Sequence, residues 1–126
     1  MAVNITSDQL TGLSVYESIS LINGAAEVVK ATRAALYGGV ISNRSAATKY
    51  VKFYNLASAT VGTQAPAFRI AIPGNASDTI TALLGIGNGM YVDFNVGLCI
   101  GASTGFANAD TGAPAANDVL ITLFFK

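Results

Sequence analysis

The stretch that decides the fold reads YVKFYN at 50–55, VGTQAP at 61–66 and FRIAIP at 68–73. In the first part Val51 and Phe53 alternate with polar or amphipathic residues, and the last part alternates in the same way. A period of two places alternate side chains on opposite faces of a strand. The stretch therefore predicts two strands joined by a Val-Gly-Thr loop. Its residue types suit the display of a sheet surface and supply no parts of a catalytic site.

Two later segments carry the same signal. The most regular alternation runs over 90–100, where we expect one continuous strand with a single buried face. Residues 118–126 form the predicted last strand, in which both faces are apolar, so Phe124 indicates a sheet covered on both sides or a subunit contact. Between them, the Ala-, Gly- and Thr-rich residues 101–117 are expected to form a surface loop.

The first third of the chain fits two descriptions. Residues 15–21 alternate and lead to the turn dipeptide Asn23-Gly24, which predicts a hairpin into a strand at 26–31. A further strand is expected at 34–41. Short helices at 14–22 and 25–36 are the alternative, because apolar residues there also recur at helical spacing.

These six to eight short strands, separated by Gly, Pro, Asn and Asp clusters, predict the fold class. We expect an all-β protein: an antiparallel β-sandwich or barrel in a single domain over residues 13–126. The polar residues 1–12 are expected to form a short extended arm outside the core.

Composition excludes several functions and favours association. Charged residues make up 11% of the chain, against about 25% in ordinary domains, and seven basic residues balance seven acidic ones. Without a net positive field we expect no nucleic-acid partner, and without a long apolar run no membrane partner. The N-terminus shows no secretory signal, so synthesis in the cytoplasm is expected. The weakly charged surface predicts a homo-oligomer.

Candidate chemistry is sparse because the chain contains no histidine. We therefore expect no enzyme activity and no catalytic, cofactor or metal-binding residues. Cys99 lies on the polar side of its strand and is interpreted as a small filler residue rather than a reactive thiol. Asp110 and Asp118 are interpreted as turn-forming residues, with a calcium site that adds Asn108 as the alternative.

The stretch at 50–73, the Pro73-Gly74 turn and the ending at 115–126 resemble small virion proteins of tailed bacteriophages. In that group a Tyr-x-Lys-x-Tyr strand, a Val-Gly-Thr-x-x-Pro loop and a final strand ending in aromatic-Lys recur. The resemblance covers residues 48–126. It implies a capsid decoration, or cement, protein with a jelly-roll-like sandwich, made as a small oligomer, with a trimer as the expected form.

We therefore expect a structural protein on the capsid surface of a virion that contacts itself and the major capsid protein. The predicted contact residues come from the arm and from two strands: Asn4, Ile5, Asp8, Leu10, Tyr50, Tyr54 and Phe124. The alternative is a receptor- or carbohydrate-binding module of a phage tail or fibre. There Tyr50 and Tyr54 would stack on a sugar, with hydrogen bonds from Asn108.

Overall fold

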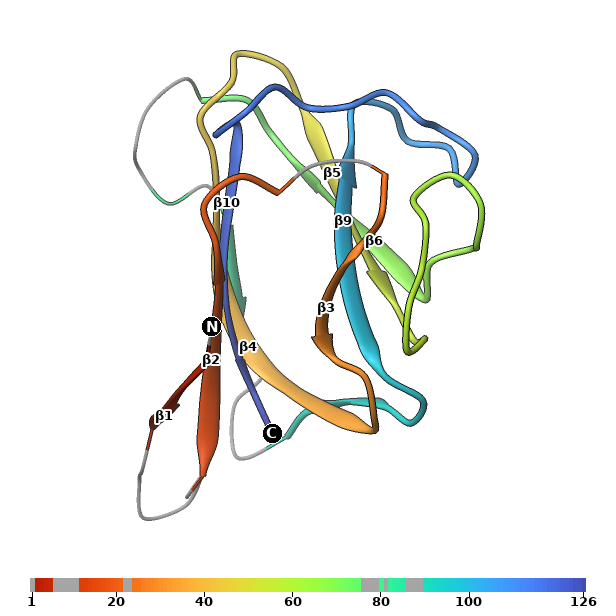
Figure 1. The fold of residues 1–126 in the computed structure, drawn as a ribbon. Helices are drawn as coiled ribbons and strands as arrows, with labels where there is room; N and C mark the ends of the chain where they lie inside the picture. Colours follow the sequence, from red (N-terminus) through yellow and green to blue (C-terminus); the bar gives the residue numbers. More distant parts are fainter. Residues whose placement is uncertain (1, 6–11, 22–23, 76–79, 81, 86–89) are drawn as a thin grey trace.

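The computed structural model describes residues 2–5, 12–21, 24–75, 80, 82–85 and 90–126, and these form ten strands and no helix. Two antiparallel sheets pack face to face as a β-sandwich, which confirms the predicted fold class (Figure 1). The strands are β1 (Ala2–Ile5), β2 (Leu13–Ser18), β3 (Glu27–Lys30), β4 (Ala34–Asn43), β5 (Lys49–Tyr54), β6 (Phe68–Ile72), β7 (Ala82–Gly85), β8 (Val92–Phe94), β9 (Leu98–Ser103) and β10 (Val119–Phe125).

The strand order is that of a jelly roll. One sheet runs β1-β2-β10-β4-β7, with β8 also paired to β4, and the other runs β3-β9-β5-β6. With β7 and β8 counted as one interrupted strand, the eight strands that follow β1 pair first with last, second with seventh, third with sixth and fourth with fifth. This nested pairing defines the jelly roll and places two Greek keys on one chain. The predicted jelly-roll-like sandwich is confirmed.

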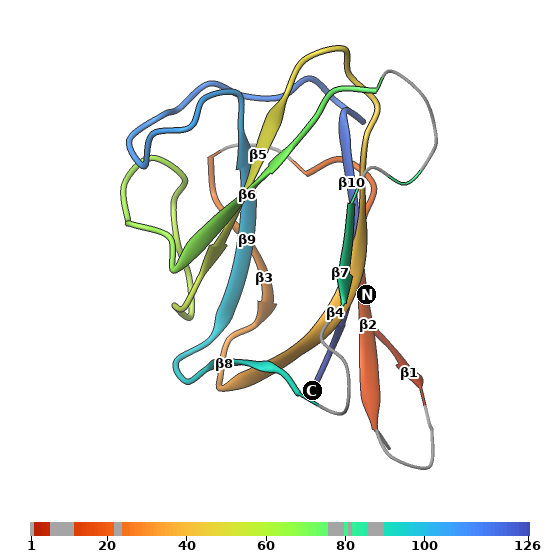
Figure 2. The same ribbon diagram turned by 180° about the vertical axis from the view of Figure 1, so that it is seen from behind.

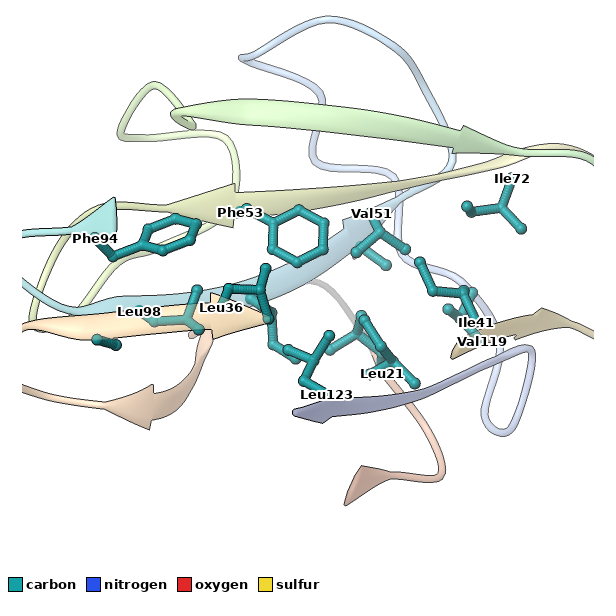
Figure 3. Packing of buried hydrophobic residues seen from close by; sticks show 14 residues of the cluster. Leu21, Leu36, Ile41, Val51, Phe53, Ile72, Phe94, Leu98, Val119 and Leu123 are labelled. Atoms are coloured by element: carbon teal, nitrogen blue, oxygen red, sulfur yellow. The ribbon is translucent and has the colours of Figure 1, made fainter. Parts of the chain in front are cut away.

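The core lies between the two sheets and is built by the alternating strands. Along β10 the residues Val119, Ile121, Leu123 and Phe125 are buried, whereas the three between them are only half-buried. From the opposite sheet, Val51 and Phe53 point into the same space, as Figure 3 shows. A Cβ at Gly39 would lie 2.3 Å from the Thr122 carbonyl oxygen, so the β4–β10 contact requires glycine.

A polar bridge joins the two sheets along one side of the sandwich. Glu27 on β3 accepts hydrogen bonds from the Tyr16 hydroxyl (2.7 Å) and the Ser18 hydroxyl (2.8 Å) of β2. Burial, together with the hydrogen bond to Glu27 and its negative charge, raises the pKa of Tyr16 above its ordinary value. The bridge therefore satisfies polar groups that would otherwise be costly between two sheets.

The prediction of a single strand over 90–100 is wrong. The segment is divided into β8 in one sheet and β9 in the other, separated by a turn at 95–97. The Asn55 side chain accepts hydrogen bonds from the backbone N–H of Val96 (2.9 Å) and Gly97 (3.5 Å), which holds this turn. Phe94 before the break and Leu98 after it are both buried in the core, whereas Val96 within the break is 49% exposed, although all three share the apolar parity of the sequence pattern.

In the first third the strand interpretation is right and the helical alternative is wrong. The hairpin predicted across Asn23-Gly24 is also wrong, because β2 and β3 lie in different sheets. Gly24 has a φ of +97°, which only glycine adopts readily, and residues 22–23 lie outside the described part of the chain.

Residues 2–5, within the segment expected to form an extended arm, are β1, an edge strand paired with β2. In both views β1 lies on the side of this sheet that faces away from the second sheet (Figures 1 and 2). Among the described residues, no helix is long and apolar enough to cross a membrane.

Candidate functional site

The two sheets differ in what covers their outer faces. Residues 55–67 and the first part of 104–117 lie on the outer side of the four-stranded sheet, and the rest of 104–117 passes over the end of the sandwich to β10 (Figures 1 and 2). Beneath them Tyr54 is fully buried in a second small cluster that includes Val61 and Cys99. The Cys99 thiol lies 3.1 Å from the Leu56 carbonyl oxygen, and burial raises its pKa. This confirms the interpretation of Cys99 as a packed filler residue.

The covered face also holds two cations side by side. Lys52 on β5 and Arg69 on β6 are directly opposite in the antiparallel register. Lys52 is fully buried, and its Nζ donates to the Ala107 carbonyl oxygen at 2.8 Å. Burial lowers the pKa of Lys52, the charge of Asp110 opposes that shift and the charge of Arg69 reinforces it. Like charges opposite one another destabilise a strand pair, so this arrangement needs compensating contacts.

The loop at 104–112 supplies those contacts. Arg69 donates a hydrogen bond to the Asn108 side chain, and its guanidinium lies 4.6 Å from the centre of the Phe106 ring. Phe106 in turn meets Tyr50 edge-on, with ring centroids 5.9 Å apart. Asp110 accepts hydrogen bonds from backbone N–H groups within the same loop. The two cations therefore fasten the loop to the sheet.

This covered cluster offers little for catalysis. Lys52 has the lowered pKa that a general base needs, yet no part of it reaches solvent. Among the described residues, no group of three His, Cys, Asp or Glu side chains is arranged to hold a metal ion. The Asp118 carboxylate accepts a hydrogen bond from the backbone N–H of Ala115 in the preceding turn. The Asp110 carboxylate accepts backbone hydrogen bonds in its own loop, so both aspartates are confirmed as turn-forming residues.

The outer face of the six-stranded sheet is different, because the side chains that point away from its core remain partly exposed. The antiparallel register places Phe124 of β10 between Val15 of β2 and Gly38 of β4. Val40 and Leu120 continue the apolar surface along these strands. We call Val15, Val40, Leu120 and Phe124 the open face. At the outward positions of 13–17, 38–42 and 120–124, Glu17 is the one charged residue.

A hollow of about 130 Å³ indents part of the open face. Val40, Leu120 and Thr122 form part of its lining, and Glu17 and the exposed Ile19 lie along it. The four open-face side chains are half-buried and lie on three neighbouring strands. A contiguous apolar surface of this kind marks a contact site more often than apolar residues that are scattered singly. The open face is therefore the surface best suited to association.

The structure separates the residues predicted from the sequence. Asn4 and Ile5 lie in the edge strand β1, opposite Ser14 and Leu13, and Asp8 and Leu10 lie outside the described residues. Phe124 belongs to the open face, whereas Tyr50 and Tyr54 lie on the other sheet. Because Tyr54 is fully buried, the pair cannot form the sugar-stacking platform of the alternative hypothesis.

Sequence reasoning did not assign Val15, Val40 and Leu120 to the contact surface, although it placed all three on predicted strands. The available signal was the second apolar face of the last strand. Its partners on β2 and β4 became visible only from the register.

The fold and its open face define the class of this protein as a jelly-roll β-sandwich in which loops cover one sheet, while the part of the chain that the structure describes leaves the open face of the other sheet accessible. No protein-family model, curated protein or solved structure matches the chain.

Proposed function

We propose that this protein is a structural component of a bacteriophage virion, of the capsid decoration type, that binds the major capsid shell as a small homo-oligomer. The observation that carries the proposal is the contrast between the two sheets. Loops of the chain cover the outer face of one sheet, whereas on the other sheet the described outward positions of 13–17, 38–42 and 120–124 are mostly apolar and carry one charge. The resemblance of residues 48–126 to small phage virion proteins agrees with this role.

The partner on the open face is a second copy of this chain. A face with one charged residue, Glu17, brings few like charges together when two copies meet, and it loses little solvation on burial. Jelly-roll sandwiches occur in viral capsid proteins, as they do in lectins and cupins. Several modest capsid contacts on one oligomer would then reinforce one another through high effective concentration.

The oligomer is tested by size-exclusion chromatography with light scattering at micromolar concentration. The wild-type chain is expected to elute as a small oligomer. Phe124→Lys places a charge in the centre of the open face, and this variant should elute as a monomer. The matched control is Val28→Lys, because Val28 is an exposed apolar strand residue on the other sheet. A monomeric wild type, or the same oligomeric state in Phe124→Lys and Val28→Lys, would contradict the assignment of the open face as the oligomer interface.

The capsid partner is tested separately by co-sedimentation with phage capsids assembled without the protein. We expect saturable binding at symmetry-related positions, visible by cryo-electron microscopy of the decorated particles. Capsids that remain bare at protein concentrations well above those of the shell sites would exclude the decoration role, whatever the oligomeric state.

A further inference from the structure

A second surface on the six-stranded sheet has a different character from the open face. At the β8 end of this sheet lies a cleft of about 280 Å³ whose lining includes Arg33, Ala35, Tyr37, Tyr91 and Asp93. None of these residues takes part in the covered loop cluster or in the open face. Its volume is just below the roughly 300–1,000 Å³ that is typical of small-molecule sites in proteins, so the cleft suits a small ligand.

A β-bulge aims the first aromatic side chain. The pairing of β10 with β4 shifts between Phe124, opposite Gly38, and Phe125, opposite Leu36, so Tyr37 is the extra residue. Bulges of this kind redirect a side chain at the edge of a sheet. Tyr91, which directly precedes β8, meets Tyr37 with ring centroids 5.3 Å apart and planes at 46°. Tyr91 keeps 47% of its surface exposed, so the pair forms an aromatic wall that is open to solvent.

An ion pair forms the polar side of the cleft. The Arg33 guanidinium donates two hydrogen bonds to Asp93, at 3.1 Å to Oδ1 and 2.9 Å to Oδ2. Both side chains are largely exposed, at 68% and 41%, so the pair contributes little to stability. Each carboxylate oxygen retains acceptor capacity for a further donor, and the guanidinium retains unused N–H groups.

A small residue separates these two sides. Ala35 lies opposite Asp93 of β8 in the register, and its backbone N–H and carbonyl pair with the carbonyl and N–H of Lys126, both at 2.9 Å. The Lys126 side chain runs toward Gly12. Lys126 also lines the cleft, beside the balanced Arg33–Asp93 ion pair. The methyl group of Ala35 leaves room between the aromatic wall and the ion pair.

These features select a ligand chemistry. An apolar peptide side chain would desolvate the Arg33–Asp93 pair without new hydrogen bonds, and a small inorganic anion would leave the aromatic wall without a contact. A pyranose ring has an apolar C–H face that packs on an aromatic ring, and hydroxyl groups that donate to a carboxylate and accept from a guanidinium. We infer that the cleft between Tyr37, Tyr91 and the Arg33–Asp93 pair binds a neutral sugar ring, independently of the proposed capsid contact.

The inference is tested by saturation-transfer NMR with a panel of neutral methyl pyranosides, followed by titration of the strongest binder. We expect transfer to the C–H face of the sugar and shifts of the Tyr37 and Tyr91 ring signals. Tyr91→Ala and Asp93→Asn should each weaken binding at least about tenfold, the loss expected for one stacking or charge-assisted contact.

The matched control is Tyr50→Ala, a tyrosine on the opposite sheet that meets Phe106 instead. It should bind the sugar like the wild type. Absence of transfer from the whole panel would overturn the inference, and so would binding that survives Tyr91→Ala or is lost only in Tyr50→Ala. Circular dichroism is used to check that each variant is folded, and light scattering of the same samples measures the oligomeric state separately.

Discussion

Asn43, the last residue of β4, is the position where a single substitution should best reveal how the two sheets are held together. Its side chain is fully buried. The Nδ2 group donates to the carbonyl oxygens of Ala47 and Ile72, both at 2.9 Å, and Oδ1 accepts from the Ser45 N–H (3.0 Å) and hydroxyl (2.7 Å). One amide thus connects the end of β4, the following turn and the end of β6 in the other sheet.

We expect Asn43→Ala to lower the free energy of unfolding by about 3 kcal/mol. The largest part comes from the Ile72 carbonyl, because Ile72 is fully buried and an unpaired buried acceptor costs about 1–3 kcal/mol. The bonds with Ser45 and Ala47 lie nearer to solvent, so water replaces them and each costs nearer ~0.5 kcal/mol. The total is a large share of the roughly 5–15 kcal/mol by which domains are stable.

The assay is urea unfolding followed by circular dichroism, with linear extrapolation to water. The matched control is Asn95→Ala, because exposed Asn95 accepts one hydrogen bond, from Asn55 at 2.7 Å, and should cost less than ~1 kcal/mol. Asn43→Asp keeps the acceptors and removes the donors, so it should destabilise at least as much as Asn43→Ala. A cost below ~1 kcal/mol for Asn43→Ala, with an unchanged denaturant slope, would refute the reasoning.

Three further predictions concern the core and the buried titratable groups. Gly39→Ala should destabilise by at least ~2 kcal/mol in the same urea assay, since its Cβ would lie 2.3 Å from a carbonyl oxygen, whereas Gly85→Ala, with open space around it, should be nearly neutral. The Cys99 thiol should react with Ellman's reagent only as fast as the protein opens, and rapid labelling of the native state would disprove its burial. The free energy of unfolding should fall as the pH rises through 10, because Tyr16 then ionises in the unfolded chain while its raised pKa keeps the folded hydroxyl protonated. Urea titrations from pH 8 to 11 should show a shallower fall for Tyr16→Phe than for the wild type. Identical profiles for the two proteins would contradict this prediction.

For the candidate site, the sequence identified single residues better than it identified surfaces. It placed Phe124 on the second apolar face of the last strand, where the structure also has it. It assigned Tyr54 to an outward position, and the parity is right, yet residues 55–67 cover that side chain. Parity specifies a face of a strand, but whether a loop then covers the face depends on contacts between residues far apart in sequence.

The Tyr37–Tyr91 cleft shows the same limit. The alternation over 90–100 places Tyr91 on the polar face of that segment, whereas no pattern in the sequence pointed to Tyr37 or Arg33. Their meeting depends on a bulge in β4 and on the pairing of β8 with β4. Neither is encoded in a local pattern, because a bulge is defined only against the partner strand.

The sequence by itself determined the all-β class, the alternating strands around 50–73 and 118–126, and the turn-forming aspartates, because backbone geometry and side-chain period act over a few residues. Only the tertiary structure decided which strands share a sheet. It divided 90–100 between two sheets, made residues 2–5 an edge strand, and left one sheet face open while covering the other. These outcomes follow from pairings between distant segments, whose free energy depends on burial and hydrogen bonding in the whole fold.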